Sequence, residues 1–155
     1  MSHIYSQMSV SGSFSTVEAA RLSGLSTDML NYLARHKLVI ASGSPNGGRG
    51  KGRKYLFADL VLLRAVKQML DRGISVLKLR KGLASFRRRG GSSLDELICR
   101  KYLVTDGYNI FFEDASNSIE ALESGQLAFA FVLELSSIRA TIEEDAARLE
   151  KVAHG

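Results

Sequence analysis

Residues 14–39 of the chain are FSTVEAARLSGLSTDMLNYLARHKLV, and they contain two helical patterns separated by a tight turn. Ser15 and Glu18 form an S-x-x-E capping box, which predicts that the first helix begins here. Gly24 is expected to end that helix. Its expected apolar face consists of Val17, Ala20 and Leu22.

The second helix is predicted to begin after Ser26, a favourable N-cap residue. Apolar residues at helical spacing are expected to face inward: Met29, Leu30, Leu33 and Leu38. Polar and aromatic residues are expected to project outward: Thr27, Asp28, Asn31, Tyr32 and Arg35. A short turn between two such helices is typical of a helix-turn-helix unit.

Residues 41–57, ASGSPNGGRGKGRKYLF, combine many Gly and Ser with the only Pro of the chain. Strand-forming residues flank this segment, so we expect a flexible β-hairpin wing. Four cations fall within six residues of it: Arg49, Lys51, Arg53 and Lys54. A pliable loop with this charge can follow a phosphate backbone.

Two more helices are expected, the first over about 58–72 and the second after Ser75. The first ends at Gly73, and the second ends in the run 87–89 of three arginines, where cations favour a helix C-terminus. The Gly-Gly-Ser-Ser stretch that follows is the predicted domain boundary. Residues 1–13, rich in Ser, are expected to be a flexible lead-in.

The charge is divided sharply between the two halves of the chain. Residues 1–91 contain 16 Lys and Arg against 4 Asp and Glu, a net charge of +12, whereas residues 92–155 contain 5 against 12, a net charge of −7. The basic half is therefore the candidate binder of a polyanion. A lone Cys99 and the lack of a long apolar run favour a cytoplasmic protein without a membrane partner.

The acidic half, residues 92–155, has a different pattern. Two β-prone runs flank Asp106-Gly107, a two-residue hairpin signal, and further strand-forming residues precede position 136. From about Ser136 the pattern is that of an amphipathic helix. We therefore expect a small module of β-hairpins closed by a C-terminal helix.

The stretch quoted first, followed by GRKYLFADLVLLRAVKQMLDRGISVLKLRKGL at 52–83, resembles the head of the MerR family of transcriptional regulators over close to half of the chain. The resemblance implies a winged helix-turn-helix DNA-binding domain, here expected over 14–89, in an α+β chain. It implies that Arg53 and Tyr55 contact the DNA backbone, with Tyr32 from the second helix. It also implies a homodimer and makes RNA polymerase a candidate partner.

The chain departs from the family pattern at several positions. The usual L-R-Y-Y/W-E segment is Leu30-Asn31-Tyr32-Leu33-Ala34 here, so an asparagine replaces the arginine and no glutamate follows. Lys37 stands where the family usually has Gly, and the wing is longer and richer in glycine. The family's long dimer-forming helix does not directly follow Phe86.

The predicted DNA-binding residues follow from their chemistry. Asn31 and Arg35, four apart on one helical face, suit adenine and guanine edges, although Asn31 is also compatible with a merely solvated position. The hydroxyls of Ser26 and Thr27 at a helix N-terminus suit a phosphate. The complete predicted set is Ser26, Thr27, Asn31, Tyr32, Arg35, Arg49, Lys51, Arg53, Lys54 and Tyr55.

Residues 92–155 are predicted to form the dimer and to be a candidate effector-binding domain, because a module of this size cannot easily bury so many apolar residues alone. The predicted dimer residues are Leu127, Phe129, Phe131, Leu133, Ile138, Ile142 and Leu149. No cluster of residues suggests a metal, a cofactor or a catalytic nucleophile, so we expect no enzyme.

The sequence therefore predicts a transcriptional regulator that binds double-stranded DNA sequence-specifically as a homodimer on an inverted-repeat operator, in the cytoplasm and associated with the nucleoid. Two alternatives stay open. The chain could be an excisionase-like architectural protein that bends DNA, because that group shares the head fold. It could also be a protein-interaction adaptor whose basic head docks on an acidic partner.

Overall fold

A computed structural model describes residues 12–44, 52–89, 94–100, 102–105, 110–113 and 131–154. The chain divides into two compact units, one of residues 1–64 with 137–155 and the other of residues 65–136. The boundary between residues 64 and 65 falls inside a helix and not at the Gly-Gly-Ser-Ser stretch of residues 90–93. The domain boundary expected at that stretch stays a prediction.

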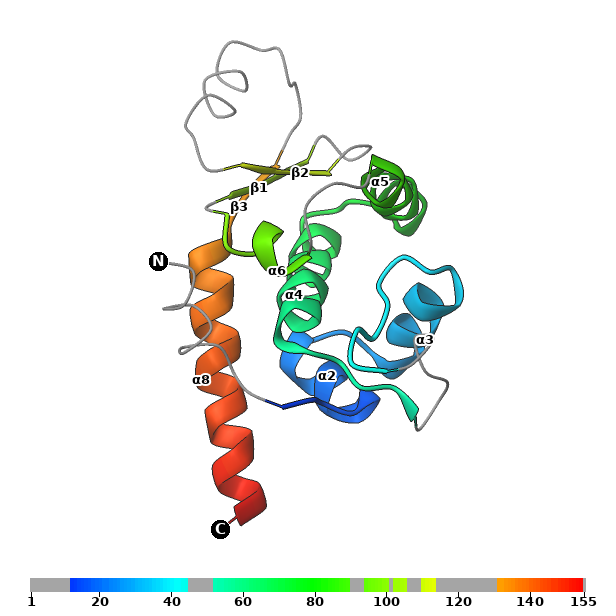
Figure 1. Cartoon of the computed structure of the whole chain (residues 1–155). Helices are drawn as coiled ribbons and strands as arrows, with labels where there is room; N and C mark the ends of the chain where they lie inside the picture. The colour runs from blue at the N-terminus through cyan, green and yellow to red at the C-terminus, as the bar shows by residue number, and fades with distance from the viewer. Residues whose placement is uncertain are drawn as a thin grey trace. The chain divides into compact units, whose positions relative to one another are not determined.

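The first unit contains the expected pair of helices, α2 (Thr16–Ser23) and α3 (Thr27–Arg35), as two consecutive short helices (Figure 1). The capping box is present: the Ser15 amide donates to Glu18 Oε1 at 2.9 Å, and the Glu18 amide donates to Ser15 Oγ at 3.2 Å. Gly24 ends α2 with a φ of 83°, in the left-handed region that glycine favours. These features confirm both ends predicted for α2.

The buried face of α2 differs from the one predicted. Ala19, Leu22 and Ser23 are buried, whereas Val17 is 62% exposed. At 100° per residue, Ala19, Leu22 and Ser23 share one side of the helix and Val17 lies on the opposite side. The prediction that Val17 faces inward was therefore wrong. The side of the helix that carries Ala19 is buried, and Val17 lies on the other side.

The turn and α3 are held by short-range contacts. The buried Ser23 accepts a hydrogen bond from the Leu25 amide at 3.2 Å, and Ser26 Oγ accepts one from the Met29 amide at 3.0 Å. Leu30 and Leu33 are buried as predicted. After α3, Lys37 has a φ of 56°, the left-handed conformation for which the family usually provides glycine.

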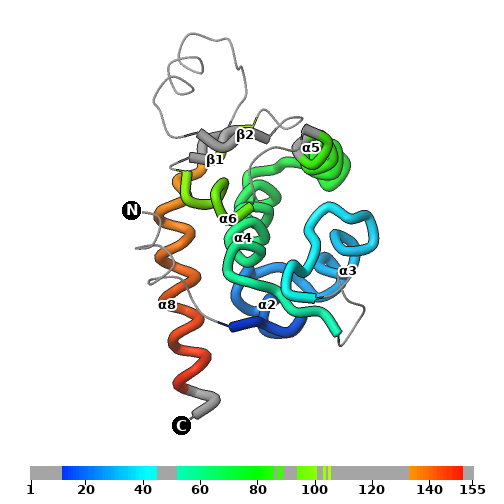
Figure 2. Tube along the Cα trace, in the orientation of Figure 1, coloured from blue at the N-terminus to red at the C-terminus, as the bar shows by residue number. Residues whose placement is uncertain are grey.

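The helix α4 (Phe57–Asp71) is preceded by an extended segment, which the Cα trace in Figure 2 follows into the helix. In this segment Tyr55 forms an antiparallel bridge with Phe14, with two backbone hydrogen bonds of 2.8 Å. Apolar residues of α4 are buried on nearly all sides: Leu60, Val61, Leu62, Leu63, Ala65, Val66 and Met69. A helix that is apolar on all sides forms the centre of a fold rather than its surface.

The second unit holds α5 (Val76–Arg89), the short α6 (Leu94–Leu97) and a three-stranded sheet. Its strands are β1 (Tyr102–Thr105), β2 (Ile110–Glu113) and β3 (Phe131–Glu134), in the antiparallel order β2-β1-β3. Thr105 pairs with Ile110, which leaves four residues between β1 and β2. The antiparallel pairing agrees with the predicted hairpin, whose predicted turn at Asp106-Gly107 lies outside the described residues.

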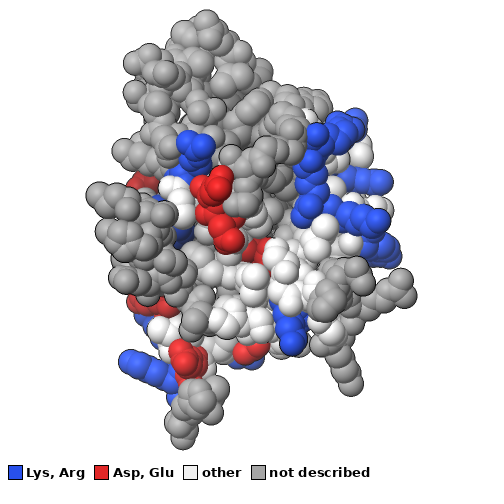
Figure 3. Space-filling view, in the orientation of Figure 1, with Lys and Arg blue, Asp and Glu red and all other residues white. Residues whose placement is uncertain are grey.

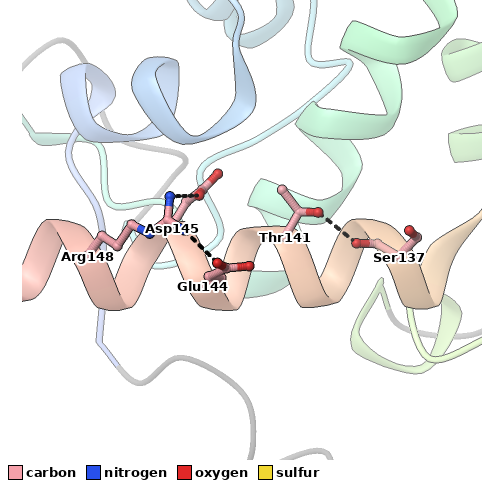
Figure 4. Close-up of polar contacts among 5 residues, drawn as sticks. All are labelled: Ser137, Thr141, Glu144, Asp145 and Arg148. Carbon is pink, nitrogen blue, oxygen red and sulfur yellow. Dashed lines mark hydrogen bonds and ion pairs between the residues drawn. The ribbon is translucent and has the colours of Figure 1, made fainter.

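The C-terminal helix is α8 (Leu135–His154). Ile138, Ile142 and Ala146 are buried at a spacing of four, which makes one stripe of the helix apolar. Elsewhere on α8, Arg148 contacts Glu144 at 2.6 Å, and the Thr141 hydroxyl donates to the Ser137 carbonyl at 3.0 Å (Figure 4). The predicted amphipathic helix is thus present.

Candidate nucleic-acid interface

The two flanks of the predicted wing are joined by backbone contacts. The Gly43 amide donates to the Lys54 carbonyl at 2.8 Å, and the Lys54 amide donates to Ser44 Oγ at 2.5 Å. A Cβ at Gly43 would lie 2.8 Å from that same carbonyl oxygen, so only glycine fits this approach. We call residues 42–44 and 53–59 the wing base. Residues 45–51, which hold the rest of the predicted hairpin with Arg49 and Lys51, lie outside the described residues.

A buried carboxylate anchors the wing base to α4. Asp59 is fully buried and accepts three hydrogen bonds: from the Ser42 amide at 2.9 Å, the Ser42 hydroxyl at 2.5 Å and the Leu56 amide at 2.8 Å. The Leu56 amide directly precedes α4, and Asp59, the third residue of the helix, accepts from it as the acidic residue of a capping box does. One side chain therefore fixes both the start of α4 and the beginning of the wing.

Within the wing base, the Tyr55 side chain points into the core rather than to the surface, since none of it is exposed. Burial raises the pKa of its phenol, and the nearby Arg53 guanidinium acts in the opposite direction. Neither the Tyr55 hydroxyl nor Arg53 Nε has a hydrogen-bond partner among the described residues. The structure gives Tyr55 a supporting position, and its direct contact with DNA stays a prediction.

Arg53 connects the wing base to α3. Its Nη1 donates to the side-chain oxygen of Asn31 at 2.6 Å, a contact between residues 22 positions apart. The two residues had been predicted to contact DNA separately, Arg53 a phosphate and Asn31 a base. The structure brings them together at the surface of the first unit.

The outer face of α3 is polar and accessible. Thr27, Asn31 and Arg35 are exposed there, while the Tyr32 ring is half-buried and lies 4.5 Å from the His36 ring, at an angle of 55°. Ser26 is exposed, and its hydroxyl already accepts the Met29 amide. This face has the length and the side chains with which a recognition helix enters a major groove.

The sequence did not predict the residues that organise this face from below. Gly43 was one glycine among several, and the bond between Ser42 and Asp59 spans 17 positions. Their role in joining the two flanks of the wing becomes visible only in the structure, where Gly43 approaches Lys54 and Ser42 bonds to Asp59.

A second basic surface lies on α5, in the other compact unit. The helix has the sequence VLKLRKGLASFRRR, without an acidic residue, and Figure 3 shows Lys and Arg side chains gathered where Figure 1 places this helix. Its exposed cations are Lys78, Arg80, Lys81, Arg87 and Arg88. This charge attracts a polyanion, and the cations at 87 and 88 also favour the C-terminus of the helix.

The residues predicted to form a dimer have varied positions. Leu133, Ile138 and Ile142 are buried within the single chain, and Leu149 is half-buried. Leu127 and Phe129 lie outside the described residues, and the side chain of Phe131 is not described. The structure gives the three buried residues a role in the core of this chain, and a dimer contact by any of the seven stays a prediction.

Within the described residues, no helix is long and apolar enough to cross a membrane. No group of three or more His, Cys, Asp or Glu side chains in the same part of the chain is placed to hold a metal ion. The exposed polar face of α3, together with Arg53, is the strongest candidate site that the described structure offers.

Comparison with known proteins agrees with this location. Residues 14–85 match the model of the MerR HTH family regulatory proteins. Over 116 residues the chain is 31% identical to uncharacterized HTH-type transcriptional regulators of Mycobacterium bovis and Mycobacterium tuberculosis, an alignment that covers 74% of this chain and 50% of each relative. The chain therefore spans half the length of the curated relatives it matches.

Proposed function

We propose that this chain is a transcriptional regulator that binds duplex DNA sequence-specifically as a homodimer, because its residues 14–85 match the MerR helix-turn-helix family. The helix α3 enters the major groove, and the wing contacts the adjacent phosphates. RNA polymerase is the second macromolecular partner in this proposal, because a regulator bound at a promoter acts on transcription through it.

The observation that carries the proposal is the outer face of α3. Its polar residues are exposed, while Leu30 and Leu33 on the opposite side are buried. The polar face of α3 can therefore contact a ligand while its apolar side stays packed in the core. Arg53 lies beside that face through its contact with Asn31. An exposed helix flanked by a cation is the arrangement that combines base reading with a phosphate contact.

The homodimer follows from the size of this site. One short helix and one wing contact too few base pairs to discriminate an operator strongly, whereas two copies related by a two-fold axis read both halves of an inverted repeat. Residues 92–155, with a net charge of −7, are repelled by DNA and remain the proposed dimer domain.

Selection of duplexes from a random library by the full chain tests the DNA-binding proposal. We expect an inverted repeat to be enriched, and Arg35→Ala to relax the preference at particular base pairs, at a cost of about 1–3 kcal/mol on the preferred site. Lys151→Ala, which removes an exposed cation of α8, is the control and should leave the preference unchanged. Enrichment of bent DNA without a sequence pattern would favour the architectural alternative.

Gel filtration with light scattering tests the homodimer. We expect the full chain to be a dimer at micromolar concentration, and Leu149→Glu to weaken the dimer, because a charge would replace a half-buried apolar side chain. Ala147→Glu adds the same charge at an exposed position of α8 and is the matched control. A monomeric full chain would contradict this part of the proposal.

A further inference from the structure

The side chain of Asn31 is already engaged in the free chain. It lies in the second turn of α3 and is exposed, and its Oδ1 accepts a hydrogen bond from Arg53 Nη1 at 2.6 Å. A donor that carries a positive charge makes this a charge-assisted bond, one of the stronger classes of hydrogen bond in proteins. One of the two acceptor positions of the amide oxygen is therefore occupied before any ligand arrives.

This contact conflicts with base reading by Asn31. An asparagine that recognises adenine uses both ends of its amide, with the oxygen accepting from one base atom and the nitrogen donating to another. Arg53 occupies one of the two acceptor positions of Oδ1, so base reading would require the amide either to turn away from Arg53 or to share this oxygen with the base. Reading a base through Asn31 would thus weaken its hold on the arginine that the wing is expected to present to a phosphate.

The surroundings of Arg53 show why a weaker hold would be costly. The residue is half-buried, and its Nε has no hydrogen-bond partner among the described residues. The hydroxyl of the fully buried Tyr55 likewise has none there, and the phenol interacts with the Arg53 guanidinium electrostatically. The bond to Asn31 is the hydrogen bond that orients Nη1 at the charged end of Arg53.

We propose that Asn31 is a positioning residue that holds Arg53 against α3, and that it does not read a base. It keeps the phosphate contact of the wing in a fixed register with the base contacts of α3, which Arg35 then provides. This inference rests on the proposed function, since it assigns roles within the same DNA-binding site. A phosphate contact gains affinity when its cation is placed before binding, because less conformational entropy is lost on association.

The first test uses the free chain and needs no DNA. The NMR resonance of the Arg53 Nε–H group should shift, and its proton should exchange faster with water, in Asn31→Ala. Thr27→Ala removes another exposed polar side chain from α3 and is the control that should leave this resonance in place. An Arg53 resonance that is unmoved by Asn31→Ala would overturn the inference.

The second test measures duplex binding by the full-length variants. Asn31→Ala should weaken binding to every duplex by the same factor, roughly threefold to tenfold, because an exposed charge-assisted bond is lost. The same change in an Arg53→Ala background should have almost no further effect, since the arginine to be positioned is gone. Arg35→Ala should instead alter the base preference.

Two results would contradict the positioning role. The first is that Asn31→Ala loses preference at a single base pair instead of losing affinity for every duplex. The second is that the fold losses of affinity in Asn31→Ala and Arg53→Ala multiply in the double variant. Failure of the proposed function itself is distinguishable, because the unaltered chain would then bind no duplex while the resonance of Arg53 still reports its contact with Asn31.

Discussion

The helix-turn-helix and the wing base lie in the same compact unit but are held together by contacts of different range. In the helix-turn-helix, the Ser15–Glu18 and Ser26–Met29 hydrogen bonds join residues three positions apart. In the wing base, the Ser42–Asp59 and Asn31–Arg53 bonds join residues 17 and 22 positions apart. Contacts of the first kind form wherever the local sequence allows them, whereas contacts of the second kind require the chain to fold first.

The difference shows which residues control each part. Each local cap contributes a modest amount to stability, and α2 and α3 are stabilised by several such caps. The wing base depends on few residues, because Asp59 alone accepts three hydrogen bonds. We therefore expect single substitutions to damage the wing base more than the helix-turn-helix.

The largest effect should come from Asp59→Ala. The substitution leaves the Ser42 amide, the Ser42 hydroxyl and the Leu56 amide without their acceptor, and we expect it to lower the free energy of unfolding by about 3–4 kcal/mol. Urea denaturation of the full chain measures this. Ser42→Ala removes only one of the three donors and should cost much less, and equal losses in the two variants would contradict the anchoring role of Asp59.

Gly43→Ala should have the next largest effect. The new Cβ would lie 2.8 Å from the Lys54 carbonyl oxygen and 2.9 Å from Leu56 Cδ2, so the two flanks must move apart, at a cost of about 1–3 kcal/mol. Duplex affinity should fall with stability because Arg53 lies in the displaced flank. Gly52→Ala is the matched control, since nothing lies within 4 Å of its added Cβ.

In the helix-turn-helix, Ser26→Ala should cost about 1 kcal/mol, the usual contribution of an N-cap, because the Met29 amide loses its acceptor. Thermal unfolding followed by circular dichroism measures the change. Thr27→Ala, at the exposed first position of α3, is the control and should change stability little. If Ser26→Ala lowered the free energy of unfolding as much as Asp59→Ala, the proposed difference between the two regions would be wrong.

The smallest effect at neutral pH should come from Tyr55→Phe, because the hydroxyl that it removes is buried and has no hydrogen-bond partner among the described residues. Burial raises the pKa of Tyr55, so its neutral form is favoured in the folded chain. The resulting stability is present below the pKa of an unfolded tyrosine, about 10, and is lost as the pH rises through the folded pKa. Denaturation at several alkaline pH values should show this loss in the unaltered chain and a weaker pH dependence in Tyr55→Phe.

By itself the sequence determined the local elements of this protein. Capping residues and apolar spacing specified the start of α2 and α3, the amphipathic α8 and the strands β1 and β2, because these signals act between residues a few positions apart. The family match over residues 14–85 confirms the MerR resemblance that the same motifs indicated. Where the local signal was ambiguous, as for Val17, the prediction of the buried side was wrong.

Only the tertiary structure decided how the candidate site is organised. It placed Tyr55 in the core, paired Asn31 with Arg53 and assigned Asp59 to the wing base. No periodicity or motif contains this information, because the partners are far apart in the sequence and each is an ordinary polar residue until the fold brings them together. The buried positions of Ile138 and Ile142 depend on the same cause, since an apolar stripe specifies that a helix face is covered but not what covers it.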